Sequence, residues 1–200
     1  KEMRQVRRHD ISMIFQEPMR SLNPVMSIRD QLRESYENIK KEDVDSKIIN
    51  NLLSVGIKDA GRVINLYPHQ LSGGMKQRVM VAMAISSKPK LLIADEPTTS
   101  LDVTIQKQVL DLLLELKDKL NMAILFITHD LAVASQISDR IIVMKNGSII
   151  ENNESSIFFQ KPKNLYSKSL LESSCYSRKI DNNPSFSNED VLNIENLKVY

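Results

Sequence analysis

Two adjacent carboxylates, Asp95 and Glu96, follow an apolar run at Leu91–Ala94 and precede Pro97. A short apolar run of this kind is typical of a buried parallel strand, whose carboxyl end opens onto the ligand-binding edge of the sheet. Carboxylates placed there can hold Mg²⁺ through water and can polarise a water molecule for attack on a phosphate. The pattern predicts a phosphoryl-transfer site, although a strand that ends in an acidic turn would also fit.

A second segment, Leu71–Arg78, reads Leu-Ser-Gly-Gly-Met-Lys-Gln-Arg and is suited to hold an anion. Gly73 and Gly74 have no Cβ atom, so the backbone can approach a phosphate closely. A helix that begins there directs free N–H groups and the positive end of its dipole at that phosphate, and Ser72 adds a hydroxyl group. The structural alternative is a Ser-Gly-Gly turn that caps an ordinary helix.

Two further polar side chains follow predicted strands. Gln16 comes directly after the apolar run Ile11–Phe15, and His129 comes after Ile124–Thr128. Each therefore stands at the predicted carboxyl end of a strand. A lone histidine or glutamine is otherwise an ordinary polar residue, and that is how we interpret His9 and His69.

The strands and helices that must position these residues alternate along the chain. Apolar runs predict strands at 11–15, 91–94 and 122–128, and helical spacing predicts helices within 28–39, 44–55, 74–87, 105–116 and 131–137. Asn146-Gly147 predicts a hairpin that pairs 140–144 with 148–151. This order favours an α/β fold with a largely parallel sheet covered on both faces, and the block between Pro18 and Ser87 is expected to be a helical subdomain inserted into it.

Composition limits the class of protein and the number of domains. The 200 residues are 42% hydrophobic and 26% charged, which suits one globular domain or one domain and a stub. A net charge of +2 implies no strong attraction to nucleic acid. Cys175 is the only cysteine, which excludes an internal disulfide and a thiolate metal cage. No apolar run approaches the roughly 20 residues that a membrane-spanning helix needs, so membrane association would require a partner.

The order of these segments resembles that of ATP-binding-cassette (ABC) ATPases over roughly residues 4–151. The stretches Ser21–Pro24, Leu66–Gln70 and Lys163–Leu171 are similar to the ATPase subunits of bacterial oligopeptide, dipeptide and nickel importers. The resemblance implies a P-loop NTPase (RecA-like) cassette with an inserted helical subdomain.

The resemblance also implies ATP and Mg²⁺ as cofactors and assigns roles to the residues above. Glu96 would be the general base, and His129 would sense the γ-phosphate. Asp95 and Gln16 would serve the metal, and Asp102 would belong to a loop that crosses between two cassettes while also capping the helix that follows. The implied ATP-binding residues are Gln16, Ser72, Gly73, Gly74, Gln77, Asp95 and Asp102.

One element of the family pattern is absent from these 200 residues, the Gly-x-x-x-x-Gly-Lys-[Ser/Thr] phosphate loop. Gly56 and Gly61 have the glycine spacing, but Arg62 and Val63 follow them. The resemblance places that loop before residue 1, so the chain is expected to be a fragment that binds ATP poorly by itself. The expected parts are a first cassette at 1–160 (helical subdomain about 18–87), an extension and linker at 161–190, and the first strand of a second cassette at 191–200.

The function that the resemblance implies is ATP hydrolysis at the interface of two cassettes, which would power a bacterial importer, most simply one for peptides. The protein would lie peripherally on the cytoplasmic face of the cell membrane. Its partners would be a second cassette, two permease subunits and, indirectly, an external binding protein, with no nucleic acid. Two alternatives stay open at this point: a soluble ABC ATPase outside transport, and a catalytically silent interaction module.

Overall fold

The computed structural model describes residues 3, 6, 9–16, 21–36, 41–99 and 101–174 of the chain. The predicted linker, Cys175 and the predicted strand at 191–200 lie outside these residues, as does Ser100. No helix in this described part is both long enough and apolar enough to cross a membrane.

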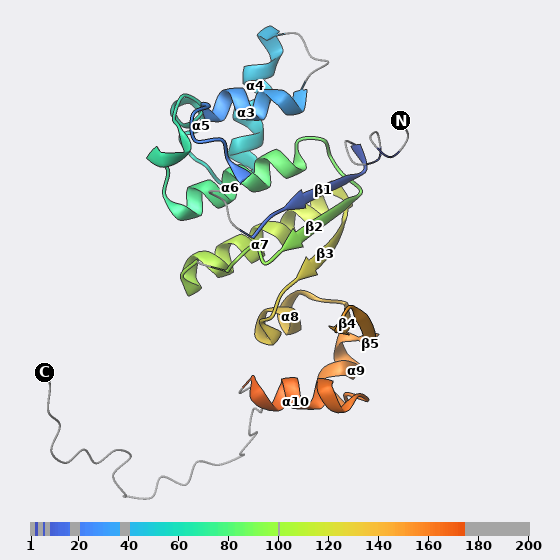
Figure 1. The fold of residues 1–200 in the computed structure, drawn as a ribbon. Helices are drawn as coiled ribbons and strands as arrows, with labels where there is room; N and C mark the ends of the chain where they lie inside the picture. The colour runs from blue at the N-terminus through green and yellow to red at the C-terminus, as the bar shows by residue number, and fades with distance from the viewer. Residues whose placement is uncertain are drawn as a thin grey trace, which may run out of the picture.

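A parallel sheet of three strands stands at the centre of the fold, in the order β1-β2-β3. It is formed by β1 (Ile11–Ile14), β2 (Leu91–Asp95) and β3 (Ala123–Ile127) (Figure 1). Ile14 pairs with Ala94, which in turn pairs with Phe126, so the three strands end at nearly the same level. The predicted strands and their parallel pairing are confirmed.

Only one face of this sheet is covered by the described residues. Helix α6 (Gly73–Ile85) and helix α7 (Val103–Leu120) pack on the face that carries Ile14, Leu92 and Phe126. On the other face Met13, Leu125 and Ile127 are 39%, 45% and 44% exposed. The expectation of a sheet covered on both faces is therefore wrong for this part of the chain. The strands read as continuous apolar runs, which predicts burial on both faces but does not supply a second layer.

The described residues between β1 and β2 also form α3 (Ile28–Arg33), η1 (Glu34–Tyr36), α4 (Lys41–Ser54), α5 (Ala60–Val63) and η2 (Pro68–Gln70). Ser27 caps α3 by accepting a hydrogen bond from the Asp30 amide. Gly56, with φ +80°, follows α4, and glycine favours this left-handed conformation after a helix. This inserted helical block shares one continuous hydrophobic core with the sheet, because Leu32 and Leu52 belong to the same buried cluster as Leu92 and Leu113.

The part after β3 forms a smaller unit with its own core. It comprises α8 (Leu131–Ile137), the antiparallel hairpin β4 (Arg140–Lys145) and β5 (Ser148–Glu154), α9 (Ser155–Gln160) and α10 (Leu165–Ser173). The hairpin is confirmed, and both Asn146 (φ +50°) and Gly147 (φ +75°) have the positive φ of a type I′ turn. Phe158 is fully buried among apolar side chains from the hairpin and α10. Sequence analysis did not predict α9 and α10.

Candidate functional site

The carboxyl edge of the sheet brings three predicted residues into direct contact. Gln16 follows β1, Glu96 follows β2 and His129 follows β3. Gln16 Nε2 donates to Glu96 Oε2 at 2.8 Å, and His129 Nδ1 lies 3.0 Å from Glu96 Oε1. Because a carboxylate only accepts hydrogen bonds, Nδ1 carries the proton in this contact and the other ring nitrogen faces elsewhere. The side chain of Glu96 is 23% exposed and that of His129 is 72% exposed, so a ligand in solution can reach both.

Thr99 is a member of this cluster that sequence analysis missed. Its Oγ1 donates to Glu96 Oε2 at 3.0 Å, and its backbone N–H donates to the Glu96 carbonyl at 3.2 Å. A threonine three residues after the acidic pair carries no distinctive signal in the sequence. It becomes a candidate only when the tight turn that begins at Glu96 is seen.

The backbone of Glu96 is strained. Its φ is +44°, in the left-handed region that residues with a Cβ atom rarely adopt, and it immediately precedes Pro97, which disfavours helical conformations further. A hydrogen bond of 2.9 Å from the Glu96 amide to the Ile127 carbonyl holds this conformation and ties β2 to the end of β3. Such strain costs about 1–3 kcal/mol and persists only where surrounding contacts fix it, as they often do at functional sites.

The hydrogen bonds around Glu96 also control its ionisation. The contact with His129 makes the largest contribution and the hydroxyl of Thr99 the next, and together they hold the pKa of the Glu96 carboxyl below its usual value. The group is therefore ionised at neutral pH. Its two oxygens offer about four acceptor positions, of which Gln16, Thr99 and His129 occupy three, so one position is left for a water molecule.

Asp95, the last residue of β2, is half-buried beside this cluster. It lies on the uncovered face of the sheet, paired in register with Ile127. The amide nitrogen of Gln16 is engaged by Glu96, so its amide oxygen is left as a possible ligand. A carboxylate and an amide oxygen suit Mg²⁺, which prefers oxygen ligands and keeps several waters. These side chains therefore fit the predicted metal.

The signature loop, Leu71–Arg78, lies at the start of α6 and has no hydrogen bond to the Glu96 cluster among the contacts of the described residues. Ser72 caps α6, its hydroxyl accepting from the Met75 amide at 3.3 Å. The two glycines differ. A Cβ atom on Gly74 would lie 3.1 Å from Ile105 Cγ2 on α7, whereas one on Gly73 would meet no atom within 4 Å. Packing within the chain therefore restricts the space at Gly74 but not at Gly73.

Two other predicted ATP-binding residues have places in the helices: Gln77 is buried in α6, and Asp102 caps α7. Gln77 is only 1% exposed on the inner side of α6, so the structure does not bring it to the surface of the signature loop. Asp102 is exposed and caps α7, accepting a hydrogen bond from the Ile105 amide at 2.9 Å. The predicted capping role of Asp102 is confirmed.

Replacing Thr99 with valine tests whether this hydroxyl positions Glu96. Loss of one hydrogen bond, worth about 1 kcal/mol, should lower the rate of a reaction in which Glu96 is the general base roughly fivefold. The acidic limb of the pH–rate profile should also move to higher pH, because a donor that lowers the Glu96 pKa is removed. Thr99→Ser keeps the hydroxyl and is the matched control. Equal rates and equal pH profiles for the two variants would show that Thr99 has no positioning role.

A parallel sheet with acids, a glutamine and a histidine at its carboxyl edge belongs to the class of α/β proteins that bind ligands at that edge. Comparison with known proteins narrows this class. The ABC transporter family model matches residues 1–99. The chain is 50% identical over 171 residues to the oligopeptide transport ATP-binding protein AppD of Bacillus subtilis, covering 84% of this chain and 52% of that protein. It is 47% identical over 173 residues to the glutathione import ATP-binding protein GsiA of Escherichia coli K12, covering 85% of this chain and 28% of that protein.

Solved structures agree with this assignment. A dimeric ATP-binding cassette in a post-hydrolysis state with ADP and Pi is similar with a TM-score of 0.65 and 28% identity, over 77% of this chain and 66% of that chain. CbiO1 of Clostridium perfringens, described as part of the ABC transporter complex cbiONQ, is similar with a TM-score of 0.70 and 26% identity, over 88% of this chain and 66% of that chain. The chain belongs to the ABC transporter family of ATP-binding proteins, and its fold is that of the P-loop NTPase cassette. It spans about half the length of the Bacillus relative and less than a third of the Escherichia relative.

Proposed function

We propose that the polypeptide carrying this chain hydrolyses ATP to power an importer, with small peptides as the favoured cargo. The observation that carries the proposal is the cluster of Gln16, Thr99 and His129 around Glu96 at the carboxyl edge of the sheet. The likeness to subunits named for oligopeptide transport and glutathione import supports the choice of cargo class.

In this mechanism Glu96 accepts a proton from the attacking water at its remaining acceptor position. Gln16, Thr99 and His129 hold the carboxylate in place, so little reorganisation is needed when the reaction occurs. The other ring nitrogen of His129 would contact the γ-phosphate of bound ATP. Asp95, with Gln16, would hold Mg²⁺, which supplies charge neutralisation at the phosphates.

The signature loop serves an ATP molecule held by a second cassette. Gly73 supports this part of the proposal, because its missing Cβ leaves an open approach to backbone N–H groups at the start of α6. A phosphate bound there would complete the site from the opposite side. The region 191–200 stays a prediction for the start of that second cassette.

Comparing Gly73→Ala with Gly74→Ala tests the sandwich arrangement. Gly73→Ala should fold as well as the wild type, since its Cβ meets nothing, yet it should lower ATP hydrolysis about tenfold or more by blocking close approach of a phosphate. Gly74→Ala is the packing comparison: its Cβ would lie 3.1 Å from Ile105 Cγ2, so that side chain must shift, while the higher helix propensity of alanine opposes this cost. Thermal unfolding and phosphate release would be measured on both. A Gly73→Ala protein that hydrolyses ATP at the wild-type rate would contradict the role of the loop.

The coupling to transport is tested by purifying the native polypeptide from membranes of its own cell. We expect it to co-purify with permease subunits, and we expect ATP turnover to rise when peptide and binding protein are added. Recovery with ribosomes or DNA instead would favour a soluble ABC ATPase. Binding to permeases without any ATP turnover would indicate a silent interaction module.

A further inference from the structure

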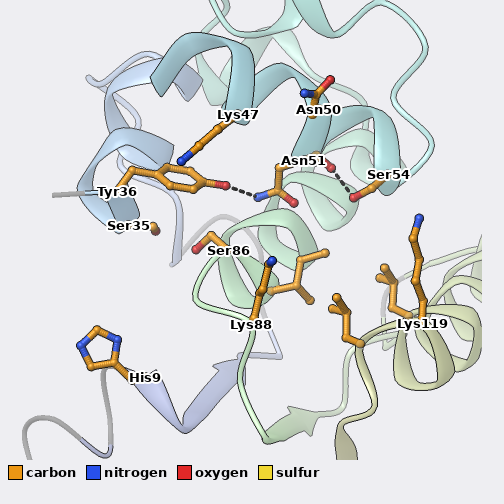
Figure 2. A pocket seen from close by; sticks show the side chains of 13 residues that line it. His9, Ser35, Tyr36, Lys47, Asn50, Asn51, Ser54, Ser86, Lys88 and Lys119 are labelled. Atoms are coloured by element: carbon orange, nitrogen blue, oxygen red, sulfur yellow. Dashed lines mark hydrogen bonds between the residues drawn. The ribbon is translucent and has the colours of Figure 1, made fainter. Parts of the chain in front are cut away.

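A cavity of about 500 Å³ lies at the amino-terminal edge of the sheet, at the opposite end of the strands from Glu96. His9 comes shortly before β1 and Lys88 shortly before β2, while Leu120 ends α7 just before β3. The other wall is formed by η1 and α4, with Tyr36 and Asn51 among the side chains that face the cavity (Figure 2). The cavity is therefore separate from the site at the carboxyl edge.

Among the described residues that line this cavity, three are lysines and none is acidic. Lys47 comes from α4, Lys88 from the connection between α6 and β2, and Lys119 from the last turn of α7 (Figure 2). None of the three takes part in the ion pairs formed within the described residues. Three elements that are distant in sequence thus place three lysines around one space.

The cavity also offers an apolar floor and a hydrogen-bond donor. Ile85 and Leu116 are buried, and Leu120 lies half-buried beside them. The Tyr36 hydroxyl accepts from Asn51 Nδ2 at 3.1 Å, which leaves its own proton free to donate. Burial raises the pKa of Tyr36 against the opposing effect of Asn51, so the hydroxyl keeps that proton at neutral pH.

The lysines have a simpler possible role, which is to neutralise the carboxyl-terminal dipoles of α6 and α7. Each helix end carries only about half a negative charge. Carbonyl groups at these ends are moreover already bonded, Ile85 O by the Lys88 amide at 2.9 Å and Lys117 O by the Met122 amide at 3.1 Å. Three full positive charges exceed what these two helix ends can balance.

The backbone at Lys88 is strained in the same way as at Glu96. Its φ is +51° and it precedes Pro89, a combination that the following proline disfavours. The bond from its amide to Ile85 holds this conformation. Strain of this kind marks positions worth testing for function.

We propose that this cavity binds a small organic anion that has a phosphate or carboxylate head and an apolar body. The head lies among Lys47, Lys88 and Lys119 and accepts a hydrogen bond from Tyr36, and the body rests on Ile85 and Leu116. The volume falls within the roughly 300–1,000 Å³ range of small-molecule sites. Because the walls come from α4, α6 and α7, a bound anion would join the helical block to the sheet layer.

Calorimetric titration of the native polypeptide tests this proposal, with Mg-ADP present throughout so that nucleotide sites are filled. The probes are phenyl phosphate, benzoate and inorganic phosphate. Phenyl phosphate or benzoate should bind, and inorganic phosphate should bind at least fivefold more weakly because it lacks the apolar body. The double variant Lys47→Gln/Lys88→Gln should weaken binding about tenfold. The control Lys58→Gln/Lys107→Gln removes two exposed lysines outside the cavity and should change affinity less than twofold.

All four lysines are exposed, so both double variants should fold as the wild type does. Thermal unfolding would check this. Equal binding by the two double variants would overturn the proposal, as would failure of both phenyl phosphate and benzoate to bind. Inorganic phosphate that binds as tightly as phenyl phosphate would also overturn it, because the apolar floor would then contribute nothing. The proposed ATPase function does not depend on any of these results.

Discussion

Replacing Glu96 with glutamine should reduce ATP hydrolysis at its site by about 10²–10⁴-fold in the native polypeptide, while ATP binding is retained. Glutamine has nearly the same shape, so the turn from Glu96 to Thr99 should survive. It cannot take up a proton from the attacking water, and it loses the charge that attracts the donors of Gln16, Thr99 and His129. The loss should appear in the maximal rate and much less in the ATP concentration at half-saturation.

Phosphate release at saturating ATP would measure this effect, and binding of a labelled ATP analogue would show that the nucleotide is still held. His129→Ala should lower the rate through the same cluster, and its effect should not add to that of Glu96→Gln. Glu154→Gln removes an exposed carboxylate at the start of α9 and is the control for charge. If Glu96→Gln turned over ATP at the wild-type rate, Glu96 would not be the general base.

Replacing Glu151 with glutamine should destabilise the unit formed by the hairpin, α9 and α10 by about 3 kcal/mol at neutral pH. Glu151 is 6% exposed and accepts hydrogen bonds from the amides of Lys163 at 2.9 Å and Asn164 at 3.0 Å, and from Asn153 Nδ2 at 2.8 Å. It thereby joins β5 to the start of α10.

The ionisation of Glu151 gives this prediction its magnitude and its pH dependence. Burial by itself raises the pKa of the carboxyl, but the amide of Lys163 and the other donors outweigh it and lower the pKa from 4.5 to about 2. The Ser167 hydroxyl also lowers it, although it makes no well-formed hydrogen bond. Because the folded-state pKa is depressed, the stabilisation is present above about pH 4.5 and is lost as the pH falls toward 2.

Amide hydrogen exchange at Lys163 and Asn164 would measure this stabilisation locally, between pH 3 and pH 7. In the wild type, protection should fall with decreasing pH after correction for the intrinsic exchange rate. In Glu151→Gln, protection should be lower at pH 7 and should depend much less on pH. Glu154→Gln serves again as the control. Unchanged protection in Glu151→Gln would mean that the carboxylate does not hold the two elements together.

Much of the fold could be predicted because its signals are local. Strands such as Leu91–Asp95 appear as apolar runs, helices such as Leu131–Ile137 as periodic ones, and the hairpin as an Asn-Gly pair. Helices α9 and α10 were missed because the apolar residues that they bury, such as Phe158, pack against the hairpin, a contact that local spacing does not reveal. The two-sided covering of the sheet was wrong because an apolar strand specifies that it should be buried but not by what.

The candidate site likewise has features that the sequence predicts and features that it does not. Position after a strand placed Gln16, Glu96 and His129 at one edge of the predicted parallel sheet, and the family resemblance gave them their roles. The role of Thr99 and the burial of Gln77 could not be read in advance. A hydrogen bond and a buried face depend on how distant segments pack, and a single sequence records neither.

By itself, the sequence determined the order of the elements, the family pattern and the residues at the strand ends, because each depends on neighbours a few positions away. The tertiary structure decided which of these residues meet. It placed three donors around Glu96, separated the roles of Gly73 and Gly74, and gathered Lys47, Lys88 and Lys119 around one cavity. These contacts join residues dozens of positions apart, and only the packing of helices on the sheet brings them together.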